Sequence, residues 1–325
     1  MTSGPGPRRD PRPRPIRAVF LGSGGFGVAS LSRLAAAPEV ELVGVVTAPA
    51  RPAGRSQTLT RTPIHDAAEA VGVPAILTPA RLRSADSVAD VLALEPALLV
   101  LADYGQIVPA ALLGLPHGAL NLHPSLLPRH RGATPIPAAI LAGDAETGVT
   151  LMRMDAGLDT GPIVAQVRLP LTGTETSPEL EDRLAGLAAA LLGDHVGAWI
   201  RGELPATSQR EDGASLTRPL RREDGRLDAS RSATALDRQV RAYLPWPGSF
   251  VEVDGVGRLI VDDATIGPAE PGDVAGRLVA DSDGLALATP DGRLRLGRVR
   301  VAGRKPMSSA DLRRGTSGLV GSVVR

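Results

Sequence analysis

The sequence predicts an α/β fold: an open, mostly parallel, Rossmann-like sheet followed by a small OB-like β-barrel. Between residues 16 and 201, short apolar runs alternate with amphipathic segments, which is typical of βαβ units. Residues 221–325 instead hold short strand-like runs separated by Gly, Asp and Pro turns, which favours a barrel. The polar residues 202–220 show little periodicity, so we interpret them as a linker, and residues 1–15 as a disordered tail.

The first strand, 16–21, runs into a glycine-rich turn, Gly22 to Gly27, and a helix that starts near Val28. The turn reads Gly-x-Gly-x-x-Gly, the pattern of dinucleotide-binding proteins. That site also needs an acidic residue at the end of the second strand, but strand 40–46 ends in Thr-Ala-Pro. We therefore predict a tight turn here, and keep a nicotinamide enzyme only as a remote alternative.

The rest of the first domain alternates in the same way. A polar loop at 51–62 has no predicted internal structure, and loops of that length are usually functional or disordered. The further predicted helices are 63–71, 85–94, 134–142 and 177–200, and the further strands are 73–77, 97–101 and 149–154. In the barrel, the predicted strands are 250–253, 258–261, 285–288 and 294–296.

Composition excludes several classes of protein. The 325 residues contain no cysteine, so disulfides and thiolate sites are excluded. The five histidines are scattered, so we expect no metal site. The Pro- and Arg-rich start does not resemble a signal peptide, and no apolar run is long enough to span a membrane. We expect a cytoplasmic protein, and a net charge of +1 indicates no particular partner.

Polar residues at the end of one predicted strand suggest a reaction site. Asn121 and His123 follow the apolar run 118–120 and, two positions apart, point to the same side of a strand. Asp159 lies between glycines, on a turn. An amide and an imidazole can hold a developing oxyanion while a carboxylate supports the imidazole, which suits attack on a carbonyl carbon. The alternative interpretation is a capping Asn, a core His and a turn Asp.

These residues carry a family resemblance. The pattern Asn-x-His-x-Ser-Leu-Leu-Pro-x-x-x-Gly at 121–132, with Leu-Asp-Thr-Gly at 158–161, resembles the folate-dependent formyltransferases. Within them, the chain is similar to the methionyl-tRNA formyltransferases, through segments 51–55, 125–136, 240–248 and 303–308. The resemblance covers about residues 16–314. The chain departs from the family pattern at Ser23–Gly25, at Ser56-Gln57 and at His130, where an aromatic residue is more usual.

The resemblance implies transfer of the formyl group of 10-formyltetrahydrofolate to the methionine amino group of initiator methionyl-tRNA, with no metal and no obligate protein partner. It assigns catalysis to Asn121, His123 and Asp159. Implied folate-binding residues are Tyr104, Gly105, Ile107, Val108, Ser125, Leu126, Leu127 and Pro128. Arg51 and Arg55 are implied to bind tRNA. The alternatives are a formyltransferase acting on an amino-sugar nucleotide and an RNA-binding relative without activity.

Overall fold

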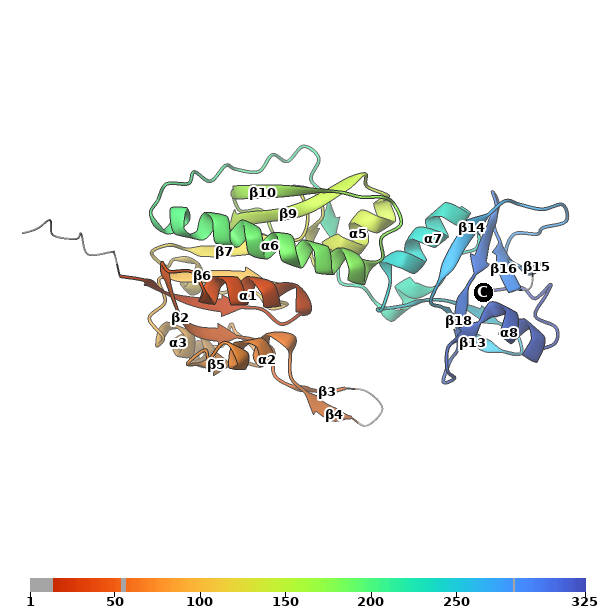
Figure 1. Ribbon diagram of the computed structural model, residues 1–325, viewed down its shortest axis with the longest axis horizontal. Helices are drawn as coiled ribbons and strands as arrows, with labels where there is room; N and C mark the ends of the chain where they lie inside the picture. The colour runs from red at the N-terminus through yellow and green to blue at the C-terminus, as the bar shows by residue number, and fades with distance from the viewer. Residues whose placement is uncertain (1–13, 54–56, 283) are drawn as a thin grey trace, which may run out of the picture. The chain divides into compact units, whose positions relative to one another are not determined.

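A mostly parallel sheet organises the first part of the chain in the computed structural model, which describes residues 14–53, 57–282 and 284–325 (Figure 1). Its strand order is β10-β9-β7-β6-β1-β2-β5. The strands from β7 to β5 run parallel, whereas β9 is antiparallel to β7. The bounds are β1 Ile16–Leu21, β2 Val40–Val46, β5 Ile76–Leu77, β6 Leu98–Ala102, β7 Ala119–His123, β9 Glu146–Arg153 and β10 Ile163–Pro170.

The chain divides into two compact units. The first comprises Met1–His123, Val149–Val167 and Ala185–Gln209, and the second comprises Pro124–Gly148, Arg168–Leu184 and Arg210–Arg325. The predicted domain boundaries at residues 201 and 221 stay predictions.

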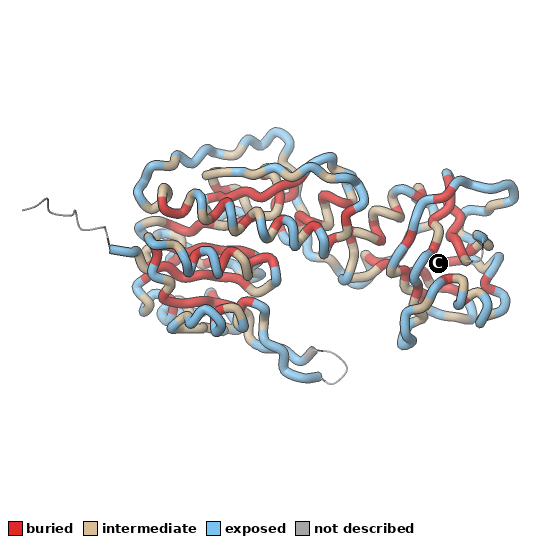
Figure 2. The backbone as a smooth tube through the Cα atoms, in the orientation of Figure 1, coloured by how far each residue is buried: buried red, intermediate tan, exposed pale blue. Residues whose placement is uncertain are grey.

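The predicted buried strands of the first unit are confirmed. All five residues of β6 are buried, as are the last four of β1 (Figure 2). Strands that are covered on both faces are continuous apolar runs, which is why the sequence predicts them. Strand β5 is shorter than predicted. Strand β10 was not predicted: its residues alternate between half-buried and exposed, so it carries too little apolar signal to be distinguished from a loop.

Local sequence also explains where the helices begin. Thr62 caps α2 (Pro63–Ala70) by accepting a bond from the His65 N–H at 3.1 Å, and Ser84 caps α3 (Ala85–Leu92) in the same way. The predicted helix at 177–200 is confirmed as α6, Ser177–Ile200. The other helices of the first unit are α1 Val28–Ala35 and the short α4 Ala110–Leu113.

The glycine-rich turn is tight for a reason of packing. A Cβ on Gly22 would lie 2.7 Å from the carbonyl oxygen of Ala102, and one on Gly24 would lie 1.6 Å from a carboxylate oxygen of Asp103. Both contacts are too close for a side chain. Glycine is therefore required at position 22, where the backbone of β6 approaches the turn, whereas a side chain at position 24 would displace the Asp103 carboxylate. No nucleotide is needed to explain the glycine at position 22.

The prediction that the loop at 51–62 has no internal structure is wrong. Strands β3 (Arg51–Ala53) and β4 (Thr58–Thr60) pair antiparallel, with Arg51 opposite Thr60, so the segment is a hairpin (Figure 1). Its sequence lacks the apolar alternation of a half-buried strand, because all three residues of β4 are exposed. Arg55 lies outside the described residues.

The second unit contains the predicted antiparallel strands. They form two sheets, β12-β13-β18-β19 and β14-β17-β16-β15, which share an apolar core that includes Leu236, Leu259 and Leu287. The strands are β12 Ser249–Val253, β13 Gly257–Val261, β14 Ala264–Gly267, β15 Leu278–Asp281, β16 Gly284–Ala288, β17 Arg293–Leu296, β18 Arg298–Val301 and β19 Met307–Ser308. The helices are α5 Pro135–Ala142, α7 Ala233–Ala242 and α8 Ser309–Gly315. Part of the predicted linker pairs as β11 (Leu216–Thr217) with β8 (Arg131–Gly132).

Candidate active site

Strand β7 carries two of the predicted site residues at its carboxyl end. His123 is its last residue, and Asn121 lies two positions earlier on the same side. Leu101 of β6 and Met152 of β9 flank Asn121 in register, so the strand is held from both sides. Polar groups at the carboxyl ends of parallel strands are where open α/β sheets bind ligands.

Asp159 joins them from a turn far along the chain. Its Oδ1 lies 3.4 Å from Asn121 Nδ2, and its Oδ2 lies 3.6 Å from His123 Nδ1. The His123 side chain is 5% exposed and that of Asp159 13%. One nearly buried carboxylate is therefore shared by an amide and an imidazole. The predicted set is brought together in space, whereas the chemical role of each member stays a prediction.

The turn that presents Asp159 is held by hydrogen bonds. Gln209 Nε2 donates to the carbonyl oxygens of Asp159 at 2.8 Å and Gly161 at 2.7 Å. Asp155 accepts from the Gly157 N–H at 2.9 Å and the Thr160 hydroxyl at 2.8 Å. Asp159 itself has φ +52°, a left-handed conformation that Asp tolerates better than most residues.

Gln209 was not among the residues predicted for the site. It lies in the polar stretch interpreted as a linker, where no periodicity distinguishes one residue from the next. Its contacts join positions about fifty residues apart, so no local signal could have identified it. The pairing of Ile163 with Thr207 brings that stretch to the Asp159 turn.

The predicted folate residues of the first unit differ in accessibility. Ile107 is 75% exposed and Gly105 is exposed, whereas Val108 is only 8% exposed and belongs to the apolar core. Tyr104 packs against the same core, and burial raises the pKa of its hydroxyl to about 12. The exposed Ile107 is thus the apolar side chain best placed to meet a ligand, and the folate-binding role of all four stays a prediction.

The loop after His123 belongs to the second unit and is tightly bonded. Ser125, fully buried, donates its hydroxyl to the carbonyl oxygen of Arg129 at 2.7 Å. His130, at the departure from the family pattern, places Nε2 at 2.7 Å from Asp144, which also binds Arg129. Leu127 is buried, and Leu126 and Pro128 are half-buried.

Other groups of polar residues in the first unit give weaker indications of a functional site. His65, Asp66 and Glu69 place possible metal-binding atoms within 4.8 Å of one another, although the sequence predicts no metal site. Both carboxylates are exposed, however, and Arg61 pairs with Glu69 at 2.7 Å. Arg51, predicted to bind tRNA, is exposed at the start of β3.

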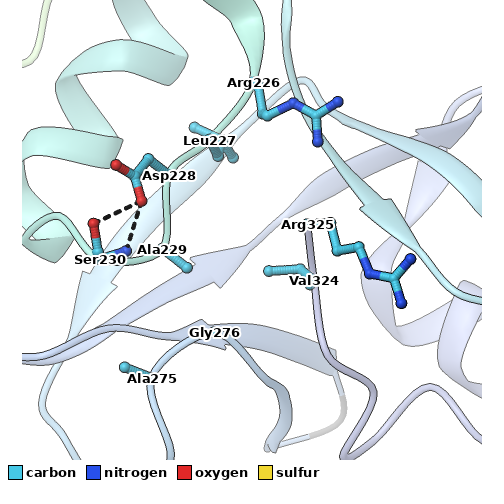
Figure 3. Close-up of a pocket in the computed structure, with 9 residues that line it drawn as sticks. All are labelled: Arg226, Leu227, Asp228, Ala229, Ser230, Ala275, Gly276, Val324 and Arg325. Atoms are coloured by element: carbon cyan, nitrogen blue, oxygen red, sulfur yellow. Dashed lines mark hydrogen bonds between the residues drawn. The ribbon is translucent and has the colours of Figure 1, made fainter.

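A pocket of roughly 380 Å³ in the second unit contains none of the predicted site residues (Figure 3). Its polar residues include Asp228, which accepts bonds from the N–H and the hydroxyl of Ser230. Across the described ranges, the helices are too short or too polar to cross a membrane.

The chain is similar to known proteins over nearly its full length. Residues 16–196 match the formyl transferase family, and residues 219–317 match the formyl transferase C-terminal domain. A methionyl-tRNA formyltransferase of Roseiflexus sp. (strain RS-1) is 42% identical over 302 residues, covering 93% of each chain. The enzyme of Gluconobacter oxydans (strain 621H) is 42% identical over 92% of this chain and 97% of its own.

Solved structures share the fold at low identity. An N-formyltransferase from Helicobacter canadensis, in complex with folinic acid and dTDP-3-aminofucose, superposes with a TM-score of 0.63 at 16% identity over 88% of this chain and all of its own. HypX from Aquifex aeolicus gives 0.60 at 17% identity over 92% of this chain, which spans 48% of HypX. The fold, both family matches and the identity over nearly the full length agree: the chain is a formyltransferase and belongs to the methionyl-tRNA formyltransferase family.

Proposed function

We propose that this chain transfers a formyl group from 10-formyltetrahydrofolate to the α-amino group of methionine on initiator methionyl-tRNA, with Asn121, His123 and Asp159 performing the chemistry. The observation that supports the residue assignment is the carboxylate of Asp159, which lies within 3.4 Å of Asn121 Nδ2 and 3.6 Å of His123 Nδ1. The proposed location is the cytoplasm.

The carbonyl oxygen of the transferred group gains negative charge when an amine attacks its carbon. Asn121 Nδ2–H and a protonated His123 are the donors that stabilise this charge. Asp159 keeps His123 oriented and charged through the contact with Nδ1, and the Nε2 side of the ring is proposed to face the reacting oxygen. A site that is 5% exposed at His123 excludes bulk water, which strengthens these interactions.

Protons must also move during the reaction. The amine loses a proton as its bond to carbon forms, and the folate nitrogen that leaves must gain one. We propose that Asp159, directly or through water, carries this proton, since it is the carboxylate that adjoins both donors.

The two substrates are assigned to separate residues. The proposed folate site uses Tyr104, Gly105, Ile107 and Val108, together with the loop residues Ser125, Leu126, Leu127 and Pro128. Bound folate supplies the activated formyl group, so no metal is required. Arg51, at the start of β3, and Arg55, which lies outside the described residues, are proposed to contact the tRNA backbone, for which arginine side chains are suited.

The test is formylation of methionine-charged initiator tRNA, with uncharged tRNA as the control. We expect transfer to the charged tRNA alone and its loss in His123→Ala. Folate binding without formylation of tRNA, together with transfer to an amino-sugar nucleotide, would replace the proposed acceptor. Full activity of His123→Ala would instead overturn the catalytic assignment.

A further inference from the structure

A second carboxyl residue, Asp103, lies at the same edge of the sheet as the candidate active site. Asp103 directly follows Ala102, the last residue of β6, and His123 directly follows Leu122 of β7. Ala102 and Leu122 are partners in the parallel register, so Asp103 and His123 occupy the same level of neighbouring strands. Both therefore lie at the carboxyl edge of the sheet, where ligands bind in this architecture.

Asp103 is held in an unusual conformation by the glycine-rich turn. Its φ is +52°, its carbonyl oxygen accepts from the Ser23 N–H at 2.9 Å, and its carboxylate accepts from the Gly24 N–H. A Cβ on Gly24 would lie 1.6 Å from Asp103 Oδ2. Gly24 thus leaves room for the carboxylate in its observed position and supplies the N–H from which the carboxylate accepts a hydrogen bond.

The surroundings of Asp103 shift the pKa of its carboxyl group. The residue keeps exposed surface, yet desolvation by the surrounding protein raises the pKa of its carboxyl, against the lowering effect of the Gly24 bond. No cation among residues 14–53, 57–282 and 284–325 lies within ion-pair distance of it. A solvent-accessible, partly desolvated carboxyl without a cationic partner is suited to meeting a cationic substrate.

We infer that Asp103 binds the ammonium form of the acceptor amino group and accepts one of its protons. The N–H bond breaks with its electron pair remaining on nitrogen, an O–H bond forms on the carboxylate, and the neutral amine is left beside His123. The exposed side of Asp103 then returns the proton to solvent. This inference rests on the proposed function, because it assumes an amine acceptor.

A separate carboxylate is needed for this step because Asp159 is already engaged. Asp159 is 13% exposed and contacts Asn121 and His123 with its two oxygens, so it supports the oxyanion side of the reaction. A protonated amine has no free electron pair and cannot attack. Two carboxyl groups allow one, Asp103, to take the first proton from the ammonium group before attack and the other, Asp159, to carry the second proton during the transfer.

The first experiment compares Asp103→Asn with the parent enzyme in steady-state kinetics. We expect KM for methionyl-tRNA to rise on the order of tenfold, the effect of losing one hydrogen bond to a charged group, with KM for the folate donor unchanged. Asp90→Asn, an exposed carboxylate on α3, is the matched control and should leave both constants unchanged. An unchanged KM for methionyl-tRNA in Asp103→Asn would overturn the inference.

Equilibrium binding provides a readout without turnover. Asp103→Asn should weaken binding of methionyl-tRNA but not of N-acetylmethionyl-tRNA, whose amide nitrogen carries no charge. Equal weakening of both would show that Asp103 acts on structure rather than on the ammonium group. A parent enzyme that formylates no tRNA at all would instead refute the proposed function.

A double-mutant cycle tests the structural pairing independently. Gly24 has φ −88°, which alanine adopts freely, so the cost of Gly24→Ala comes from the clash with Asp103. We expect Gly24→Ala to lower the thermal unfolding temperature, and Asp103→Ala to relieve most of that loss in the double variant. Additive losses would show that the two residues are not interlocked, and would remove the conformation on which the inference depends.

Discussion

The carboxylate of Asp159 is shared between two side chains of one strand: Oδ2 lies 3.6 Å from His123 Nδ1 and Oδ1 lies 3.4 Å from Asn121 Nδ2. Because β7 fixes Asn121 and His123 two positions apart, a single turn residue can reach both. The arrangement fixes the orientation of the donors before any substrate binds. Preorganised donors of this kind account for much of the catalytic effect of enzymes on acyl transfer.

Replacing Asp159 by asparagine should isolate its charge. Asparagine tolerates the left-handed φ of +52°, so the turn should persist, whereas alanine would also change the backbone preference. We expect kcat to fall roughly 100-fold or more in Asp159→Asn, the usual scale of general acid–base catalysis, with little change in the thermal unfolding temperature. Turnover within a few-fold of the parent would show that the carboxylate is structural.

Removing the amide of Asn121 should act on the transition state. We expect Asn121→Ala to lower kcat by about 100- to 1,000-fold with a small effect on KM for either substrate, as for other oxyanion donors. Steady-state kinetics of Asn121→Ala and the parent enzyme, with each substrate varied in turn, measure kcat and both KM values. A loss confined to KM would assign Asn121 to ground-state binding.

Arg51 and Arg55 should affect the binding of tRNA and not that of folate. We expect Arg51→Ala and Arg55→Ala to raise KM for methionyl-tRNA, and each to reduce the slope of log affinity against log salt by roughly one. Folate affinity should not change. Arg168→Ala, an exposed arginine on β10 that pairs with Glu146, is a matched control. An unaltered salt slope in both hairpin variants would indicate that the hairpin does not meet phosphates.

Glu175 should make the free energy of unfolding depend on pH in the acidic range. Burial alone would raise its pKa, but bonds from the Thr172 N–H at 2.7 Å, the Thr172 hydroxyl and the Gly173 N–H lower it from 4.5 to about 2. A lowered pKa stabilises the folded state above pH 4.5, and this contribution is lost as the pH falls toward about 2.

Glu175→Gln should therefore have a smaller free energy of unfolding than the parent at neutral pH, and the difference should shrink between pH 4.5 and about 2. Urea unfolding at a series of pH values measures this, with Asp90→Asn as the control. A difference that stays constant with pH would show that the bonds do not favour the ionised form.

Much of the fold could be predicted from the sequence because it depends on local patterns. Strands β1, β2 and β6 are nearly continuous apolar runs, and α6 is a long alanine- and leucine-rich segment. The sequence therefore predicts that these segments are buried. The hairpin β3–β4 and the strand β10 were missed because their residues are largely exposed, and exposed strands lack that pattern. Pairing with a neighbour, which the sequence does not record, defines them.

The sequence by itself determined the fold class, the family motifs and the chemical identity of the three candidate catalytic residues, since these follow from residue type and spacing along one chain. Only the tertiary structure decided what surrounds them. Gln209 supports the Asp159 turn across about fifty residues, and Asp103 lies at the carboxyl edge of the sheet, level with His123, through the register of β6 with β7. Contacts between distant residues depend on how the strands pair, and no local pattern encodes that pairing.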